Sequence, residues 1–180
     1  MAHAPSRTDD APLRQFQIVS ELLETPPLAR VYTHADRTGP VTVGEIVTET
    51  GVPQGTVYDY VDRLETAGLL RTVAAGRPAK YATEPVGLTL STDAGSQTVD
   101  TTLIAAVARR ETDEDLDVFV DRHGLDGLAA ALEYTREFVD GTVNARITAR
   151  ELDLSPLEAE IVLQALEPVV RASTGDGGDC

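Results

Sequence analysis

The sequence predicts a mainly α-helical protein with a small β-hairpin in its N-terminal half. Three observations support this fold class. Apolar residues recur at helical spacing over several segments, and helix-capping residues stand at the starts of those segments. Between residues 42 and 83, a short helix, a tight turn and a longer helix are followed by two strand-like segments around the turn 75–78.

The composition limits the classes of protein to which this chain can belong. With 180 residues and 42% hydrophobic residues, the chain can form one large or two small domains with a real core. No apolar run approaches the ~20 residues of a membrane span, and residues 1–10 lack a secretory apolar region. The one cysteine, Cys180, is the last residue, so no internal disulfide can form. We therefore expect a cytoplasmic protein.

The first elements are two helices. Residues 11–24 carry apolar side chains at helical spacing, and the prolines at 26 and 27 end this helix. A further helix over 27–37 is broken at Gly39. We assign residues 1–26 to a tail and a helical arm, and the second helix to a new domain.

A helix-turn-helix follows. Thr42 and Glu45 form a capping-box pattern at the start of a helix, and Gly51 supplies a left-handed residue at its end. Pro53 is expected at the first position of the next helix, where a missing amide costs nothing. That helix, 54–67, has one apolar face formed by Val57, Val61 and Leu64.

The opposite face of helix 54–67 is polar and aromatic, and the predicted wing carries two cations near its tip, Arg77 and Lys80. Gln54 could pair with an adenine edge, Tyr58 could contact a backbone sugar or a thymine methyl, and the cations would lie beside phosphates. Alternative interpretations are an ion pair between Asp59 and Arg63 and a merely solvated turn. The candidate DNA-binding residues are Thr42, Gln54, Gly55, Thr56, Tyr58, Asp59, Arg63, Arg77 and Lys80.

Residues 27–92 resemble the winged helix-turn-helix of prokaryotic transcription regulators, in the broad MarR-like, ArsR-like and TrmB-like group. The resemblance rests on Thr56-Val57, on Leu64-Glu65 followed by Gly68-Leu69-Leu70, and on Gly76-Arg77 with Tyr81. It implies a helix that enters the DNA major groove beside a β-wing. Members of the group usually carry more basic residues on that helix, where this chain has Asp59 and Asp62.

The charge is unusual for a DNA-binding protein. The chain has 30 acidic and 15 basic residues, and Lys80 is its only lysine, a composition that resembles proteins of halophilic archaea. Residues 1–90 hold 11 acidic and 8 basic residues, whereas 91–180 hold 19 and 7. The N-terminal half is therefore less repulsive toward phosphate, which favours DNA binding there.

Residues 93–172 are expected to form an α-helical C-terminal domain for dimerisation or sensing. A second hairpin over 86–99 precedes helices at 101–110, 113–123, 125–140 and 156–171. Thr112 and Ser155 are predicted N-caps, Gly124 and Gly141 are predicted stops, and Ser155 with Glu158 gives a second capping box. Residues 173–180 are expected to be a disordered tail.

Helix 156–171 offers a broad apolar face. It is either buried within its own domain or used for self-association, and its acidic residues exclude a second DNA-reading helix. Regulators of the resembled group commonly dimerise, so we expect a homodimer. The predicted dimerisation residues are Leu157, Ile161, Leu163, Leu166 and Val170.

Two functions from different classes remain. The first is a sequence-specific, dimeric DNA-binding transcription regulator with double-stranded DNA and an unknown small molecule or protein as partners. The second is a winged-helix adaptor that binds proteins and never touches DNA. The sequence contains no metal-ligand cluster, phosphate-binding loop or nucleophile elbow, so we expect no enzyme, no metal and no cofactor.

Overall fold

The computed structural model describes residues 11–93 and 95–175. It is mostly helical, with two small antiparallel hairpins, and it has the predicted fold class of a winged helix followed by a helical region. The chain divides into two compact units, Met1–Ile104 and Ala105–Cys180. The sequence placed a domain boundary earlier, at 92/93, so the second hairpin falls in the first unit.

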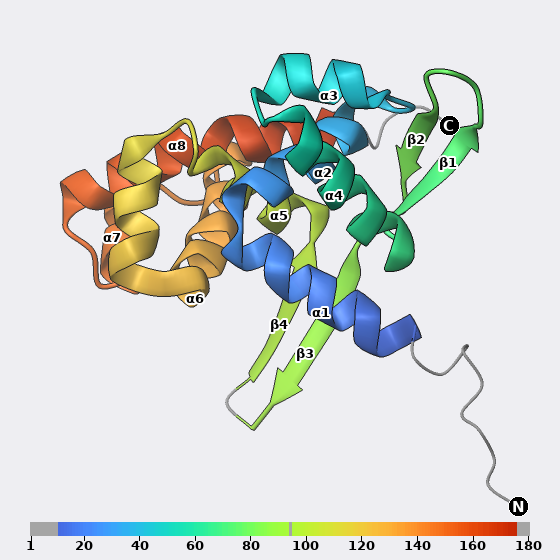
Figure 1. Cartoon of the computed structure of the whole chain (residues 1–180). Coiled ribbons are helices and arrows are strands. Elements are labelled where there is room, and N and C mark those ends of the chain that lie inside the picture. The colour runs from blue at the N-terminus through green and yellow to red at the C-terminus, as the bar shows by residue number, and fades with distance from the viewer. Residues whose placement is uncertain (1–10, 94, 176–180) are drawn as a thin grey trace, which may run out of the picture. The chain divides into compact units, whose positions relative to one another are not determined.

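The first unit begins with four helices, α1 (Ala11–Glu24), α2 (Pro26–Thr38), α3 (Val43–Thr50) and α4 (Gln54–Thr66) (Figure 1). Helix α2 packs against α1, α3 and α4. Its buried face explains why: Leu28, Val31 and Tyr32 are completely inaccessible to solvent. Each helix supplies a strip of apolar residues to this core, as the periodicity predicted.

The turn between α3 and α4 depends on local backbone signals. Gly51 ends α3 with a φ of 69°, a left-handed conformation that glycine adopts without steric cost. We predicted Pro53 as the first residue of the next helix, but it lies one residue before the helix begins. It is the N-cap of α4, with an extended ψ of 140°, and its carbonyl accepts the first helical bond, from the amide of Val57.

The wing consists of strands β1 (Leu70–Ala74) and β2 (Lys80–Thr83), which pair antiparallel with an irregularity between Thr72 and Ala74. A third segment joins this sheet, because Val41 and Tyr81 exchange backbone hydrogen bonds of 2.9 and 2.8 Å. The residues before α3 are thereby fixed to the wing.

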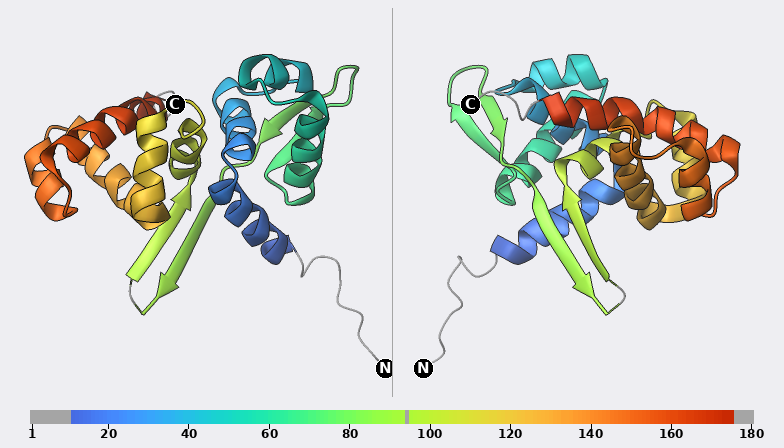
Figure 2. Two further views of the ribbon diagram at one scale, coloured as in Figure 1. Left: turned by 60° about the vertical axis from the view of Figure 1, so that its left-hand side comes forward. Right: turned by 180° about the vertical axis from the view of Figure 1, so that it is seen from behind.

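A second hairpin follows, formed by β3 (Gly87–Thr92) and β4 (Gly95–Asp100). Figure 2 shows it as a two-stranded ribbon of its own, separate from the wing sheet. The carboxylate of Asp100 then accepts a 2.8 Å bond from the amide of Leu103 and caps α5 (Thr101–Arg109). The expected hairpin and the helix after it are confirmed.

The second unit contains α6 (Glu114–Val139), α7 (Ala145–Glu151) and α8 (Pro156–Gly175). The two helices predicted at 113–123 and 125–140 both lie within α6, and they meet at the predicted stop, Gly124, whose φ of 70° and ψ of −173° are not helical. The predicted N-cap Thr112 is wrong by one residue: the side chain of Asp113 accepts the amide of Leu116.

The sequence analysis did not predict helix α7. The side-chain oxygen of Asn144 caps this helix by accepting hydrogen bonds from the amides of Arg146 and Ile147. Helix α8 is longer than predicted, since 173–175 continue it where we expected a disordered tail. The remainder of that predicted tail, 176–180, lies outside the described residues. Within the added turn, 173–175, the hydroxyls of Ser173 and Thr174 donate to the carbonyl of Val170 at 2.8 and 2.9 Å.

Only half of the second capping box forms. The amide of Glu158 donates to the hydroxyl of Ser155 at 3.1 Å, as predicted. The carboxylate of Glu158 does not return to Ser155. Its Oε1 lies 2.9 Å from Nε2 of His123 on α6 and so joins α8 to α6.

Three of the five predicted dimerisation residues are core residues of the second unit. Leu163, Leu166 and Val170 are 1%, 0% and 3% exposed, so their side chains are already covered. Of the predicted set, Leu157 is 67% exposed and Ile161 is partly accessible. The apolar face of α8 therefore packs within its own unit over most of its length. Among the described residues, no helix combines the length and the apolar character that crossing a membrane requires.

Candidate nucleic-acid interface

Helix α4 has one buried and one open face. Val57, Val61 and Leu64 are 0%, 2% and 0% exposed, so the helix is fixed on the core as predicted. The opposite face projects into solvent, and Tyr58 on it is 54% exposed. The remaining members of this face are exposed as well, namely Gln54, Gly55, Asp59, Asp62 and Arg63.

The first turn of α4 is the part of such a helix that contacts base edges. Gln54 and Gly55 are exposed there, and Thr56 is half-buried. A Cβ placed on Gly55 would meet nothing within 4 Å, so the glycine leaves an open space beside the helix. This turn can approach a flat surface closely, with the Gln54 amide as both donor and acceptor.

Arg63 is held by another element. Its guanidinium pairs with the carboxylate of Glu21 on α1, and its side chain remains 45% exposed. The alternative ion pair with Asp59 is not formed within the described residues. Glu21 was missed by the sequence analysis, because a contact between two helices leaves no signal in local spacing. Arg63 can reach a phosphate only if it gives up this pair.

The wing supplies the unengaged cations. Arg77 lies in the loop between β1 and β2, Lys80 begins β2, and both are exposed. Neither has an ion-pair partner among the residues that the structure describes. Arg71 on β1 is different, because it lies 2.6 Å from the carboxylate of Glu84. Its charge is largely compensated, and the positive potential of the wing comes from Arg77 and Lys80.

Three side-chain hydrogen bonds hold the wing against the helices. The hydroxyl of Thr72 on β1 donates to Glu65 of α4 at 2.6 Å. Just past the end of β2 that lies away from the wing loop, the carbonyl of Glu84 accepts a 2.9 Å hydrogen bond from buried Tyr32. Thr83 donates to Asp36 at 3.0 Å. These hydrogen bonds fix the strands of the wing to α2 and α4, so the wing and the open face of α4 belong to the same folded unit.

Thr42 is a capping residue in the structure. Its amide donates to Oε2 of Glu45 at 2.7 Å, and its Oγ1 accepts the Glu45 amide at 3.2 Å. Only 8% of Thr42 is exposed. Because the hydroxyl and the amide are both engaged, we remove Thr42 from the DNA-facing set. It acts on that set indirectly, by fixing the start of α3.

The capping box gives a pH-dependent prediction. The amide and hydroxyl of Thr42 hold the pKa of Glu45 below its usual 4.5, with a smaller contribution from the charge of Lys80. A lowered pKa in the folded state means that the stabilisation is present above 4.5 and is lost as pH falls through the folded value. Glu45→Gln should therefore lower the free energy of unfolding at neutral pH, and the difference from wild type should shrink in acid. Urea titrations at both pH values measure this, and a difference independent of pH would contradict it.

The electrostatics of the interface are mixed. Asp59 and Asp62 stand on the open face of α4, whereas Arg77 and Lys80 stand on the wing. A phosphate backbone is attracted to the wing and repelled by the middle of the helix. The arrangement thus suits close contact at the first turn of α4 and at the wing loop, and it disfavours nonspecific attraction along the whole helix.

Comparison with known proteins agrees with this geometry in the first unit. Residues 29–86, which contain α3, α4 and the wing, match the TrmB family, described as sugar-specific transcriptional regulators. The match supports a winged-helix regulator. TrmB proteins are DNA-binding transcription regulators and not enzymes, which is the class expected from the sequence.

The second unit matches a different family. Residues 110–174 match DUF7437, a family of unknown function. Each of the two matches covers less than half of the chain. No significant match was found among curated proteins or among solved structures. Within the described residues, no group of three or more histidine, cysteine or acidic side chains could hold a metal ion.

Proposed function

We propose that this protein is a sequence-specific transcription regulator that reads the DNA major groove with α4 and holds the adjacent phosphates with the wing. The observations that carry the proposal are the exposed first turn of α4 and the exposed cations of the wing, Arg77 and Lys80, which have no ion-pair partner among the described residues. The first turn of α4 can read base edges, and the wing cations can fix the position of the protein on the duplex.

The proposal includes a homodimer. A single winged helix reads only a few base pairs, whereas two α4 helices about 34–36 Å apart would match one turn of DNA. An acidic chain of net charge −15 needs salt to approach DNA, and its composition supports adaptation to high ionic strength. At molar salt the Debye length is about 3 Å, so binding would depend on short contacts.

Two substitutions on α4 test base reading. Selection of bound duplexes from a random pool by the wild type should yield a preferred site. Gln54→Ala and Tyr58→Ala should then change the preference at particular base pairs, by about 1–3 kcal/mol where a bidentate hydrogen-bonded pair is removed. Thr66→Ala is a matched control, since Thr66 is exposed at the far end of the same helix. Identical preferences of all four proteins would argue against base reading by α4.

A specific observation favours a second function. Asp59 and Asp62 occupy the middle of the open helix face, where they repel phosphate. A protein-binding adaptor would use such a face to contact a basic partner. The same selection experiment separates the functions: an adaptor would enrich no duplex at any salt concentration.

A further inference from the structure

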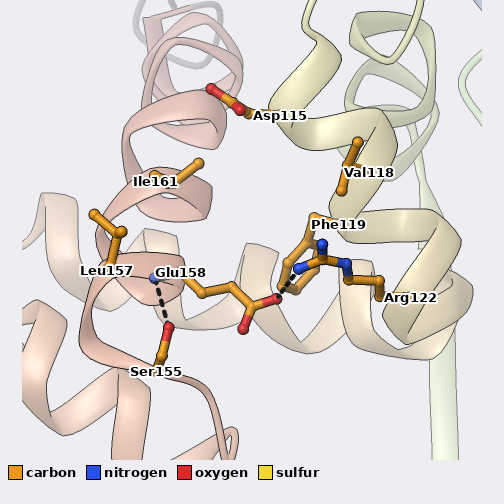
Figure 3. Close-up of a pocket in the computed structure, with 8 residues that line it drawn as sticks. All are labelled: Asp115, Val118, Phe119, Arg122, Ser155, Leu157, Glu158 and Ile161. Atoms are coloured by element: carbon orange, nitrogen blue, oxygen red, sulfur yellow. Dashed lines mark hydrogen bonds and ion pairs between the residues drawn. The ribbon is translucent and has the colours of Figure 1, made fainter.

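The second unit carries an open groove of about 270 Å³ between α6 and α8. Figure 3 shows Val118 on the α6 side and Leu157 and Ile161 on the α8 side, with Phe119 between the helices. Val118 is 42% exposed and Leu157 is 67% exposed, although Phe119 is buried. Val118 and Leu157 are among the few large apolar side chains that are exposed in the described part of the chain. The groove therefore presents apolar surface that the unit itself leaves uncovered.

Opposite charges flank this apolar surface on one face of α6. Asp115 and Arg122 both line the groove and are seven residues apart, which places them on the same helix face about 10 Å from each other. Val118 lies between them. Asp115 is exposed and has no ion-pair partner within the described part of the chain. Arg122 is 67% exposed, and its distance to Glu158 is 3.8 Å, so this pair is weak.

This charge pattern is complementary to itself. If two α6 helices lie antiparallel across a two-fold axis, Asp115 of each copy faces Arg122 of the other, and the two Val118 side chains meet at the axis. Leu157 and Ile161 of each α8 then flank the contact. A two-fold interface requires such self-complementarity, and a row of like charges would prevent it.

We propose that the groove between α6 and α8 is the surface through which two copies of this chain associate. The interface joins apolar contacts of Val118, Leu157 and Ile161 to two ion pairs between Asp115 and Arg122. This inference rests on the homodimer in the proposed function, and it identifies the surface through which that homodimer forms. It also replaces the predicted use of Leu163, Leu166 and Val170, which are buried in the unit.

Charge reversal provides a sharp test. The D115R chain presents two cations at this face and the R122D chain presents two anions, so each variant alone places like charges opposite each other. We expect each to raise the dissociation constant of the dimer at least about tenfold. Mixed in equal amounts, the two variants should form a heterodimer, because every facing pair is then attractive. Sedimentation equilibrium of the full-length chains, with one of them fluorescently labelled, measures all three cases.

Controls separate this surface from others. Circular dichroism confirms that each variant is folded, as expected for exposed positions. Leu157→Asp should weaken association as strongly as charge reversal. Phe16→Asp changes another exposed apolar residue, one that does not line the groove, so it should leave association unchanged. Association abolished in F16D but retained in L157D would overturn the inference.

Two further outcomes would also overturn it. These are a monomeric wild type across micromolar concentrations and a mixture of D115R and R122D that fails to associate. Neither outcome bears on DNA binding by α4 and the wing, which the selection experiment tests separately.

Discussion

Replacing both wing cations, Arg77→Ala with Lys80→Ala, should weaken DNA binding on the order of 10²-fold and by a similar factor for every sequence. Each side chain is exposed and free to approach a phosphate, and a charge-assisted hydrogen bond contributes about 1.5 kcal/mol, or roughly tenfold. The slope of log affinity against log salt should become shallower by about 0.9 for each phosphate that the variant no longer neutralises. Fluorescence anisotropy over a salt series measures both quantities.

The control for this variant removes the same number of positive charges from the other unit. Arg150 and Arg171 are 77% and 61% exposed, and both pair with neighbouring glutamates. Their double alanine variant has the same net charge as the wing variant, but the proposed interface is intact. Its affinity and salt slope should stay near the wild-type values. Equal weakening in the two double variants would show that net charge governs binding and not the wing.

The second large effect concerns the core of the second unit. Leu166→Ala should lower the free energy of unfolding by about 2–5 kcal/mol, because Leu166 is completely buried and its truncation leaves a cavity. Leu157 is the same residue type on the same helix, but it is 67% exposed. Leu157→Ala should change the free energy of unfolding by less than about 0.5 kcal/mol. Urea denaturation of dilute protein measures both.

This pair of leucines also separates folding from association. The structure makes Leu166 a core residue, whereas we propose that Leu157 contacts a second copy. L157A should therefore weaken association without changing the stability of the monomer. A large drop in stability in L157A, with little change in L166A, would reverse these assignments.

The helix-turn-helix and wing were predictable because their signals are local. Thr42 and Glu45 form the predicted capping box, and Gly51 has the predicted left-handed conformation. The apolar spacing of α4 identified its buried face, and it therefore also identified Tyr58 as exposed. Capping and periodicity are decided within a few residues, so a single sequence records them.

Two of the differences have another physical origin. Arg63 pairs with Glu21 from α1, and the carboxylate of Glu158 turns to His123 on α6. In both cases a partner distant in the sequence replaced the local one that spacing suggested. Such competition is settled by where the helices lie, and that information is absent from the spacing of residues along one helix.

The sequence by itself determined every helix and strand except α7, the ends of most helices and the face that α4 turns to solvent, since these follow from backbone preferences and short-range periodicity. Tertiary structure decided which apolar residues of α8 are covered. Leu157, Leu163 and Leu166 look alike in the sequence, but only contacts with α6 and α7 bury the last two. It also brought Asp115, Val118 and Leu157 to one groove, because burial and charge pairing across helices depend on how the whole unit packs.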